Sequence, residues 1–181
     1  MPPRGGDPIR SLKIAQLLKD KVHAVNITDG SRAIMRMCSL AMSKLLLDNG
    51  IEPIMQISCR DRNKIALQSD ILGANALGIK NILCITGDSV KAGDQQETKA
   101  VHEFEAVRLL KQIQSFNQGI DPTFDQLPDK RTEIFSGAAV DPSCQNQRSL
   151  KSRTIKKKGA GANFLQTQIV MDRKCLADFC N

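Results

Sequence analysis

Residues 53–88, PIMQISCRDRNKIALQSDILGANALGIKNILCITGD, contain two short apolar runs separated by a polar turn and a helix-like segment. The first run spans residues 53–59, and the second, residues 81–86, stops at a Thr-Gly-Asp sequence. Gly78 provides the left-handed residue at which many helices end. Between the runs, small and apolar residues recur at helical spacing: Ile65, Ala66, Ser69, Leu72, Gly73 and Ala76. The stretch predicts a strand–helix–strand unit.

The same alternation continues on both sides of this unit. Short apolar runs predict further strands at residues 22–28, 133–140 and 163–170. Apolar residues at helical spacing predict helices at residues 10–21, 31–48 and 101–116. Because no two strands follow one another directly, the strands are predicted to be parallel and joined by right-handed crossovers.

Such a pattern fits either a doubly wound sheet or a TIM barrel. No G-x-G-x-x-G follows the first strand, and Gly159 and Gly161 precede a strand, so a TIM (β/α)8 barrel is favoured. A complete barrel has eight strands and typically about 250 residues. This chain of 181 residues offers five predicted strands and the end of an earlier one. We therefore expect an incomplete α/β barrel whose ligands bind beyond the carboxyl ends of the strands.

Composition narrows the class of protein. Hydrophobic residues make up 41% of the chain, which is ordinary for a single domain with a buried core. No apolar stretch approaches the roughly 20 residues of a membrane span, and the N-terminus has no apolar signal segment. We therefore expect no membrane contact and a cytoplasmic location. Trp and Tyr are absent, so a flavin would rest mainly on aliphatic and backbone surface.

The six cysteines do not form a disulfide or metal-binding pattern. Cys38, Cys59 and Cys84 lie in apolar helix or strand patterns, where reduced cysteine acts as a small hydrophobe. No CxxC pair is present, and Cys175 and Cys180 have no partner ligands nearby in the sequence. No metal site is therefore expected.

The formal net charge is +7, and much of it falls in residues 148–158, which contain no acidic residue. The cations are Arg148, Lys151, Arg153, Lys156, Lys157 and Lys158. They form either a solvated helix face or a phosphate-binding edge. No nucleic acid partner is expected, because aromatic residues are not interleaved with the cations and no recognition motif is present.

The segment ISCRDRNKIALQSDILGANALGIKNILCITGD, residues 57–88, resembles the corresponding stretch of the methylenetetrahydrofolate reductases. Two further segments agree in order. Pro2-Pro3-Arg4 resembles the turn after that family's first strand, and residues 161–168, GANFLQTQ, resemble its sixth-strand signature. The resemblance implies that residues 1–181 form one partial (β/α) barrel catalytic domain, with about strands 2–6 and the end of strand 1. A truncated member or a fragment of the family is therefore expected.

The resemblance implies the reaction that members of this family catalyse. Its members use a noncovalent FAD to carry hydride from NAD(P)H to 5,10-methylenetetrahydrofolate, giving 5-methyltetrahydrofolate in one-carbon and methionine metabolism. The resemblance thus implies an oxidoreductase with FAD as cofactor, NAD(P)H as co-substrate and a folate substrate.

The resemblance also assigns roles to individual residues. Asp88 matches an aspartate between flavin and folate that holds the pterin and tunes the flavin, which makes it the catalytic candidate. Gln168 matches a folate-contacting glutamine, whose amide can donate and accept hydrogen bonds. Thr28 and Gly87 match flavin-contacting positions. Lys156 and Lys157 match basic positions near the flavin diphosphate. Ser58 and Arg60 are further candidates for the pocket lining.

Some positions depart from the family pattern. Thr86 stands where flavin-bearing members have arginine, Gln56 and Asp141 stand at histidine positions, and Leu150 stands where an acid is expected. These positions are nevertheless expected to line the flavin site. The family's general acid, a first-strand glutamate, would lie two positions before Met1. Because losing a general acid typically costs ~10²- to 10⁴-fold in rate, we expect negligible activity from the isolated chain.

Two other functions fit the same residues. The chain could be a noncatalytic partner subunit that retains the folate and flavin pocket, or a phosphate-binding barrel of different chemistry that uses residues 156–158. An open barrel leaves strand edges unpaired and apolar surface uncovered. We therefore expect a homo-oligomer or a partner chain that supplies the missing strands.

Overall fold

The computed structural model describes residues 1–121, 123, 126–127 and 131–180. Five parallel strands form one sheet in chain order: β1 (Val25–Ile27), β2 (Pro53–Ser58), β3 (Asn81–Ile85), β4 (Phe135–Val140) and β5 (Phe164–Thr167). The helices are α1 (Ile9–Gln16), α2 (Ser39–Asp48), α3 (Lys64–Ala76), α4 (Ala106–Asn117), α5 (Gln147–Gly159) and α6 (Arg173–Cys180). Two short 3-10 turns, η1 (Ser31–Ala33) and η2 (Val90–Ala92), follow β1 and β3.

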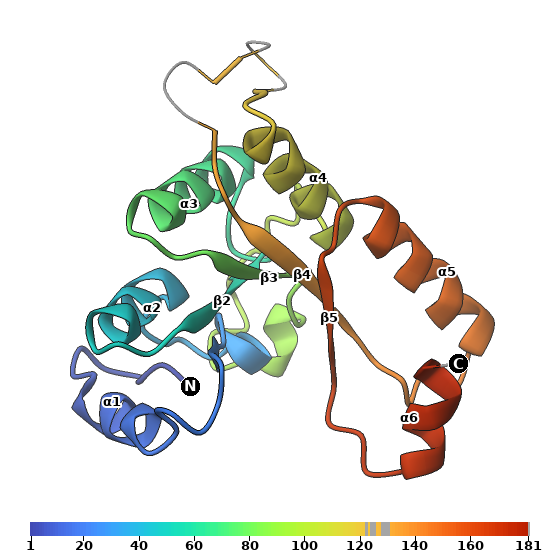
Figure 1. The fold of residues 1–181 in the computed structure, drawn as a ribbon, viewed down its shortest axis with the longest axis horizontal. Helices are drawn as coiled ribbons and strands as arrows, with labels where there is room; N and C mark the ends of the chain where they lie inside the picture. The colour runs from blue at the N-terminus through green and yellow to red at the C-terminus, as the bar shows by residue number, and fades with distance from the viewer. Residues whose placement is uncertain (122, 124–125, 128–130, 181) are drawn as a thin grey trace.

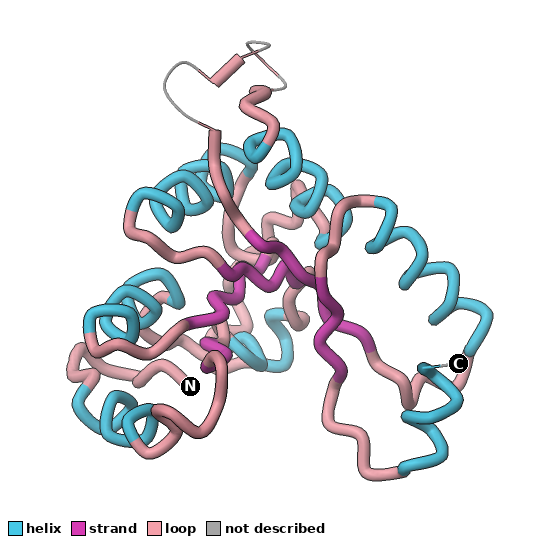
Figure 2. The backbone as a smooth tube through the Cα atoms, viewed as in Figure 1, coloured by secondary structure: helices cyan, strands magenta, loops and turns pink. Residues whose placement is uncertain are grey.

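The sheet is curled, and helices α2 to α5 lie along its convex side (Figure 1). The tube view shows the strands as an arc with α2 to α5 along its outer side (Figure 2). Five adjacent parallel strands with an intervening helix at each crossover are part of a (β/α)8 barrel. The predicted fold class is therefore confirmed.

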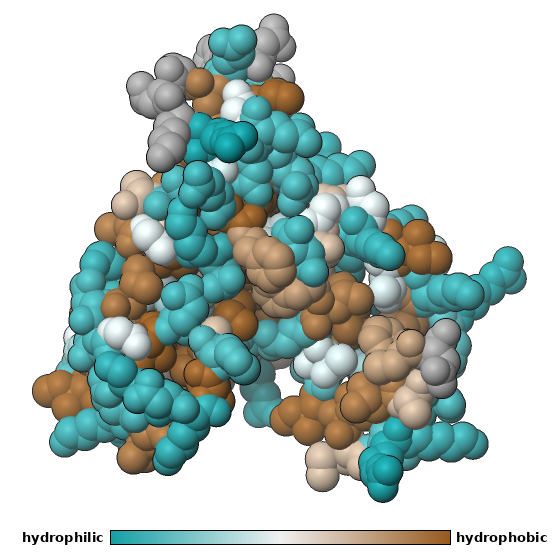
Figure 3. All heavy atoms as spheres, in the orientation of Figure 1, coloured by the Kyte–Doolittle hydropathy of each residue, from teal (hydrophilic) through white to brown (hydrophobic). Residues whose placement is uncertain are grey.

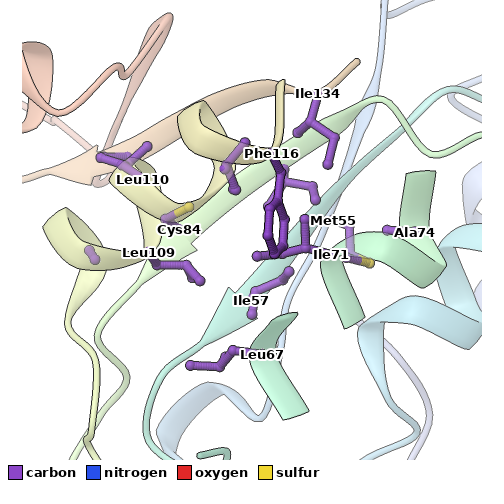
Figure 4. Close-up of a cluster of buried hydrophobic side chains, with 14 of the residues drawn as sticks. Met55, Ile57, Leu67, Ile71, Ala74, Cys84, Leu109, Leu110, Phe116 and Ile134 are labelled. Atoms are coloured by element: carbon purple, nitrogen blue, oxygen red, sulfur yellow. The ribbon is translucent and has the colours of Figure 1, made fainter. Parts of the chain in front are cut away.

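The convex side of the sheet holds the main hydrophobic core (Figure 4). Alternate strand residues, such as Met55, Ile57 and Cys84, point toward α3 and α4. The helices contribute a matching set of buried side chains: Leu67, Ile71, Ala74, Leu109, Leu110, Ile113 and Phe116. Because side chains alternate along a strand, the residues between these positions face the concave side of the sheet.

The concave side carries both polar and aromatic side chains. Gln56 on β2 donates from Nε2 to Asn26 Oδ1 of β1 at 3.3 Å. At the other end of the sheet, Phe135 and Phe164 stack with their ring centroids 5.5 Å apart. Gly137 of β4 is in register with Phe164 of β5, and the ring of Phe164 occupies the space that a side chain at Gly137 would need. The space-filling view shows the molecule hollowed between the part with α1 and the part with α6 (Figure 3).

Helix α3 exists as predicted, and Gly78 is left-handed at its end with φ +84°, but the predicted buried face is wrong. Ile65 is 72% exposed and Leu72 is 39% exposed. The buried side chains are Leu67, Ile71 and Ala74, which follow a second stripe of the same period. Asn63 caps this helix by accepting from the Ala66 amide at 2.9 Å.

The predicted helix at 31–48 is also wrong over residues 31–38. Gly30, Arg32 and Ala33 have φ values of +52°, +58° and +54°, so the chain turns through the left-handed region instead of entering a helix. Helix α2 begins only at Ser39, after an extended backbone at Cys38. Cys38 is consequently exposed, not buried as the pattern suggested.

Several other helices and strands are shorter than predicted. The helix at 101–116 begins at Ala106, because His102 has a left-handed φ of +46°. The helix at 10–21 ends at Gln16 and is followed by turns. The strands at 22–28, 133–140 and 163–170 narrow to β1, β4 and β5, since the flanking apolar residues lie outside the paired part of the sheet.

A buried ion pair joins the ends of β1 and β2. The Asp29 carboxylate is 6% exposed and accepts from Arg62 Nη1 at 2.6 Å and from the Ser58 amide at 2.8 Å. Arg62 also pairs with Asp70 of α3 at 2.7 Å. Burial raises the pKa of Asp70, while Arg62 counteracts this shift. The network fixes two strand ends and α3 relative to one another.

The described part of the chain contains no helix that is both long and apolar enough to cross a membrane. Within the same residues, no three His, Cys, Asp or Glu side chains gather where they could hold a metal ion.

Substitution Asp29→Ala is expected to lower the free energy of unfolding by about 3 kcal/mol, because it leaves Arg62 without its most buried partner. The control Lys44→Ala removes an exposed i,i+4 pair with Asp48 and should change stability by no more than about 0.5 kcal/mol. Urea denaturation measures both variants. Equal effects for the two would contradict a structural role for the Asp29 network.

Cys59 and Cys84 should resist alkylation in the folded protein. Both are fully buried, and burial raises the pKa of Cys59 to about 12 and the pKa of Cys84 well above its ordinary value. Cys38 and Cys180 are exposed. Iodoacetamide at about pH 8.5, near the ordinary cysteine pKa, should modify Cys38 and Cys180 first, as mapped by mass spectrometry. Rapid native labelling of Cys84 would contradict this packing.

Candidate ligand-binding site

The carboxyl ends of the five parallel strands meet at one edge of the sheet, where a (β/α) barrel places its ligands. Polar or glycine-containing segments follow each strand at this edge: residues 28–30 after β1, 59–62 after β2, 86–88 after β3, 141 after β4 and 168 after β5. Most site residues predicted from the sequence belong to one of these segments; the exceptions are Gln56, Ser58, Leu150, Lys156 and Lys157. Gln56 and Ser58 lie within β2, and Leu150 and the two lysines lie on α5.

Asp88, the predicted catalytic residue, lies exposed beyond the end of β3. Its Oδ2 accepts a hydrogen bond from the Arg32 amide of η1 at 2.7 Å. The carboxylate is therefore held by the loop after β1, while its backbone belongs to the loop after β3. Exposure and a single backbone donor leave oxygen lone pairs free to accept hydrogen bonds from a ligand.

Gly87 and Thr86 have local structural roles. Gly87 has a φ of +97°, and a Cβ there would lie 2.8 Å from Arg60 Cβ, so the protein itself requires glycine. Thr86 is exposed, and its hydroxyl accepts from the Ala106 amide at the start of α4 at 3.5 Å. These contacts explain both residues without a ligand.

Thr28 directly follows β1, and Gln56 lies in the neighbouring strand β2. The Thr28 hydroxyl oxygen is buried and has no hydrogen-bond partner within the described structure. Gln56 is 9% exposed and bonds to Asn26. An unpartnered buried hydroxyl is costly unless another group satisfies it, so Thr28 is a candidate for a ligand or water contact.

At the other end of the edge, Asp141, Lys157 and Gln168 line one cavity of about 170 Å³. Helix α5 provides Lys157, while the ends of β4 and β5 provide Asp141 and Gln168. Three site residues predicted separately from the sequence are thus brought together. Lys156, which was predicted with Lys157 to lie near the flavin diphosphate, is exposed on α5 and does not line this cavity.

Lys157 is held in place by the sheet. Its Nζ donates to the Ala139 carbonyl of β4 at 2.6 Å. Burial, and then the nearby charge of Arg153, lower the pKa of Lys157. A half-buried ammonium beside a second cation favours an anionic ligand, since an anion would offset both the desolvation and the repulsion.

Arg153 and Thr154 line the same cavity but were not predicted as site residues. Leu150, Arg153, Thr154 and Lys157 recur at the i, i+3, i+4 and i+7 spacing of one helix face. That spacing was a usable signal, although it was hidden within a stretch in which most residues are cationic. The Thr154 hydroxyl is buried without a described partner, like that of Thr28.

A second cavity, of about 300 Å³, lies between the loops after β1, β2 and β3. Arg36, Arg60 and Arg62 line it together with Asp29 and Asp61. Arg60 and Arg62 are paired with these carboxylates. This cavity lies beside β1 to β3, and the cavity lined by Asp141, Lys157 and Gln168 lies beside β4 and β5, at the same edge of the sheet.

Comparison with known proteins agrees with this architecture. The comparison with curated proteins gives no match. A family model described as methylenetetrahydrofolate reductase matches residues 1–181, which is the whole chain. The matched region includes the five-stranded part of the barrel and every site residue described above. The chain belongs to the methylenetetrahydrofolate reductase family.

Proposed function

We propose that this chain binds FAD and a folate at the carboxyl edge of its sheet and serves the reduction of 5,10-methylenetetrahydrofolate to 5-methyltetrahydrofolate, with NAD(P)H as the hydride source. Family membership supports an oxidoreductase of this kind. The observation that carries the finer proposal is the cavity shared by Asp141, Lys157 and Gln168, since it joins a phosphate-compatible cation to a polar amide.

The residues present fit a flavin dinucleotide in two respects. Lys157 and Arg153 provide a cationic wall for a diphosphate, and among the residues that the structure describes Asp141 is the one carboxylate that lines their cavity. Thr28 presents a buried hydroxyl that lacks a partner in the described structure. A bound flavin would supply the relay of hydride between the nicotinamide and the folate.

The two ends of the edge are far enough apart for an extended ligand. β1 and β5 are separated by four strand spacings, so their distance along the sheet is roughly 19 Å. We place the diphosphate beside Lys157 and Arg153. Gln56 and Thr28 would then contact the part of the cofactor that lies over β1 and β2. Thr86 and Gly87 shape the exit of β3 between these ends.

Asp88 and Gln168 would hold the folate. β3 and β5 are two strand spacings apart, roughly 10 Å, so ligands the size of a ring system fit between the side chains that follow them. The Asp88 carboxylate can accept two hydrogen bonds from the amino and ring N–H groups of a pterin. The Gln168 amide can donate and accept at the same ligand. These two residues orient the substrate for reduction.

Substitution Lys157→Gln should weaken FAD binding about 10- to 100-fold, because a charge-assisted hydrogen bond to phosphate contributes roughly 1.5–3 kcal/mol. Lys151→Gln is the matched control, since Lys151 is exposed on the same helix. Equilibrium dialysis with detection of flavin absorbance measures both dissociation constants. Equal affinity of the Lys157→Gln variant and the wild type would contradict the proposed diphosphate site.

The change Asp88→Asn should weaken binding of 5-methyltetrahydrofolate to the FAD-loaded chain about 10-fold or more, since the amide keeps the shape of the side chain but loses the anionic acceptor. Calorimetric titration measures this binding. Thr167→Ala is the control, because Thr167 lies beside Gln168 in the sequence but points to the opposite side of β5. A folate affinity that is lowered by Thr167→Ala and not by Asp88→Asn would place the folate elsewhere.

A further inference from the structure

Arg60 is a charged side chain buried between three loops of the site. It follows β2, is 4% exposed and lines the cavity of about 300 Å³. Burying a guanidinium is costly unless its donors are satisfied. The hydrogen-bond partners of the buried Arg60 guanidinium therefore indicate which loops it connects.

The guanidinium of Arg60 contacts the loops after β1, β2 and β3. Nε and Nη2 donate to the Asp61 carboxylate at 2.7 and 2.6 Å. Nη1 donates to the Gly30 carbonyl at 3.1 Å and, over a longer 3.5 Å, to the Asp88 carbonyl. Asp61, followed by the charges of Asp29 and Asp88, raises the pKa of Arg60. One side chain thus bridges three strand exits.

Two glycines make room for this bridge. A Cβ at Gly30 would lie 2.6 Å from Arg60 Nη2, and a Cβ at Gly87 would lie 2.8 Å from Arg60 Cβ. Both glycines also have a positive φ. The exits of β1 and β3 can therefore close on Arg60 because neither has a side chain at the point of contact.

The hydrogen bond between the Arg32 amide and the Asp88 carboxylate depends on Arg60 at both of its ends. The Asp88 carboxylate is held by the Arg32 amide, and Arg32 lies two residues after Gly30. The Asp88 backbone carbonyl receives Arg60 Nη1 directly. Arg60 therefore contacts both partners of the Arg32–Asp88 hydrogen bond: the loop that carries the Arg32 donor, through Gly30, and the Asp88 backbone itself.

We propose that Arg60 is a positioning residue for Asp88: it fixes the exits of β1 and β3 so that the Asp88 carboxylate faces the folate. This proposal rests on the function proposed above. Lysine cannot replace Arg60, because a single ammonium lacks the planar fork that donates to Asp61 and to two carbonyls at once.

A double-mutant cycle tests the assignment. Arg60→Met, Asp88→Asn and the double variant are loaded with FAD and titrated calorimetrically with 5-methyltetrahydrofolate. If Arg60 acts through Asp88, Arg60→Met weakens folate binding about 10-fold in the wild-type background and by less than about 2-fold in the Asp88→Asn background. Arg60→Lys should behave like Arg60→Met. Equal losses in both backgrounds, or no loss in either, would overturn the proposal.

A second measurement separates this proposal from the proposed function. Amide hydrogen exchange of the ligand-free chain should be faster in Arg60→Lys than in wild type for residues 30–34 and 86–90, and unchanged in β2 and β3. Unchanged exchange in both loops would overturn the positioning role. A wild-type chain that binds no folate would refute the proposed function alone. If Arg60→Met does not fold, Gly30→Ala replaces it in the cycle, because its Cβ displaces the guanidinium.

Discussion

The alternation of side chains along β2 and β3 is the constraint on which the rest of the structure depends. Met55, Ile57 and Cys84 pack against α3 and α4, so the residues between them must face the concave side. A shift of one residue would exchange these two sets and move Gln56 into the apolar core. Parallel pairing then brings every strand exit to the same edge. The position of the site is thus set by hydrophobic burial on the opposite face.

Within that edge, local order comes from buried charge. Asp29 ties β1 to Arg62 and Ser58, and Arg60 ties the loop after β1 to the loop after β3. Of these side chains, Arg60 directly contacts a residue that we assign to a ligand, through the Asp88 carbonyl. The β4–β5 side is organised differently, by a lysine from α5 that bonds to a strand carbonyl. The two halves of the site therefore have separate supports, one made of arginine–carboxylate pairs and one made of a helix docked on the sheet.

Much of this could be predicted from the sequence. The strand–helix alternation predicted all five strands and the barrel class, because apolar runs and helical spacing reflect burial directly. The resemblance named Asp141 and Lys157 as flavin-site positions and Gln168 as a folate position, and the structure places all three around one cavity.

The errors in the sequence prediction have physical causes. Left-handed backbone at Arg32 and Ala33 interrupts the predicted helix at 31–48, and no residue type in that stretch signals it. The buried face of α3 was misassigned because two apolar stripes share the same period. No pattern in the sequence indicated that Gly87 also packs against Arg60 and Ser58, whose side chains fill the space beside it. Buried contacts between distant residues, such as those of Arg60, leave no local pattern in a single sequence.

The most direct test of the account is hydrogen exchange measured on the chain with and without FAD. We expect FAD to protect amides in residues 139–141 and 153–157 and in the loops after β1 and β3, while α1 and the outer face of α3 stay unchanged. Protection confined to α1 or α6, or no protection at saturating FAD, would contradict a flavin site at the carboxyl edge of this sheet.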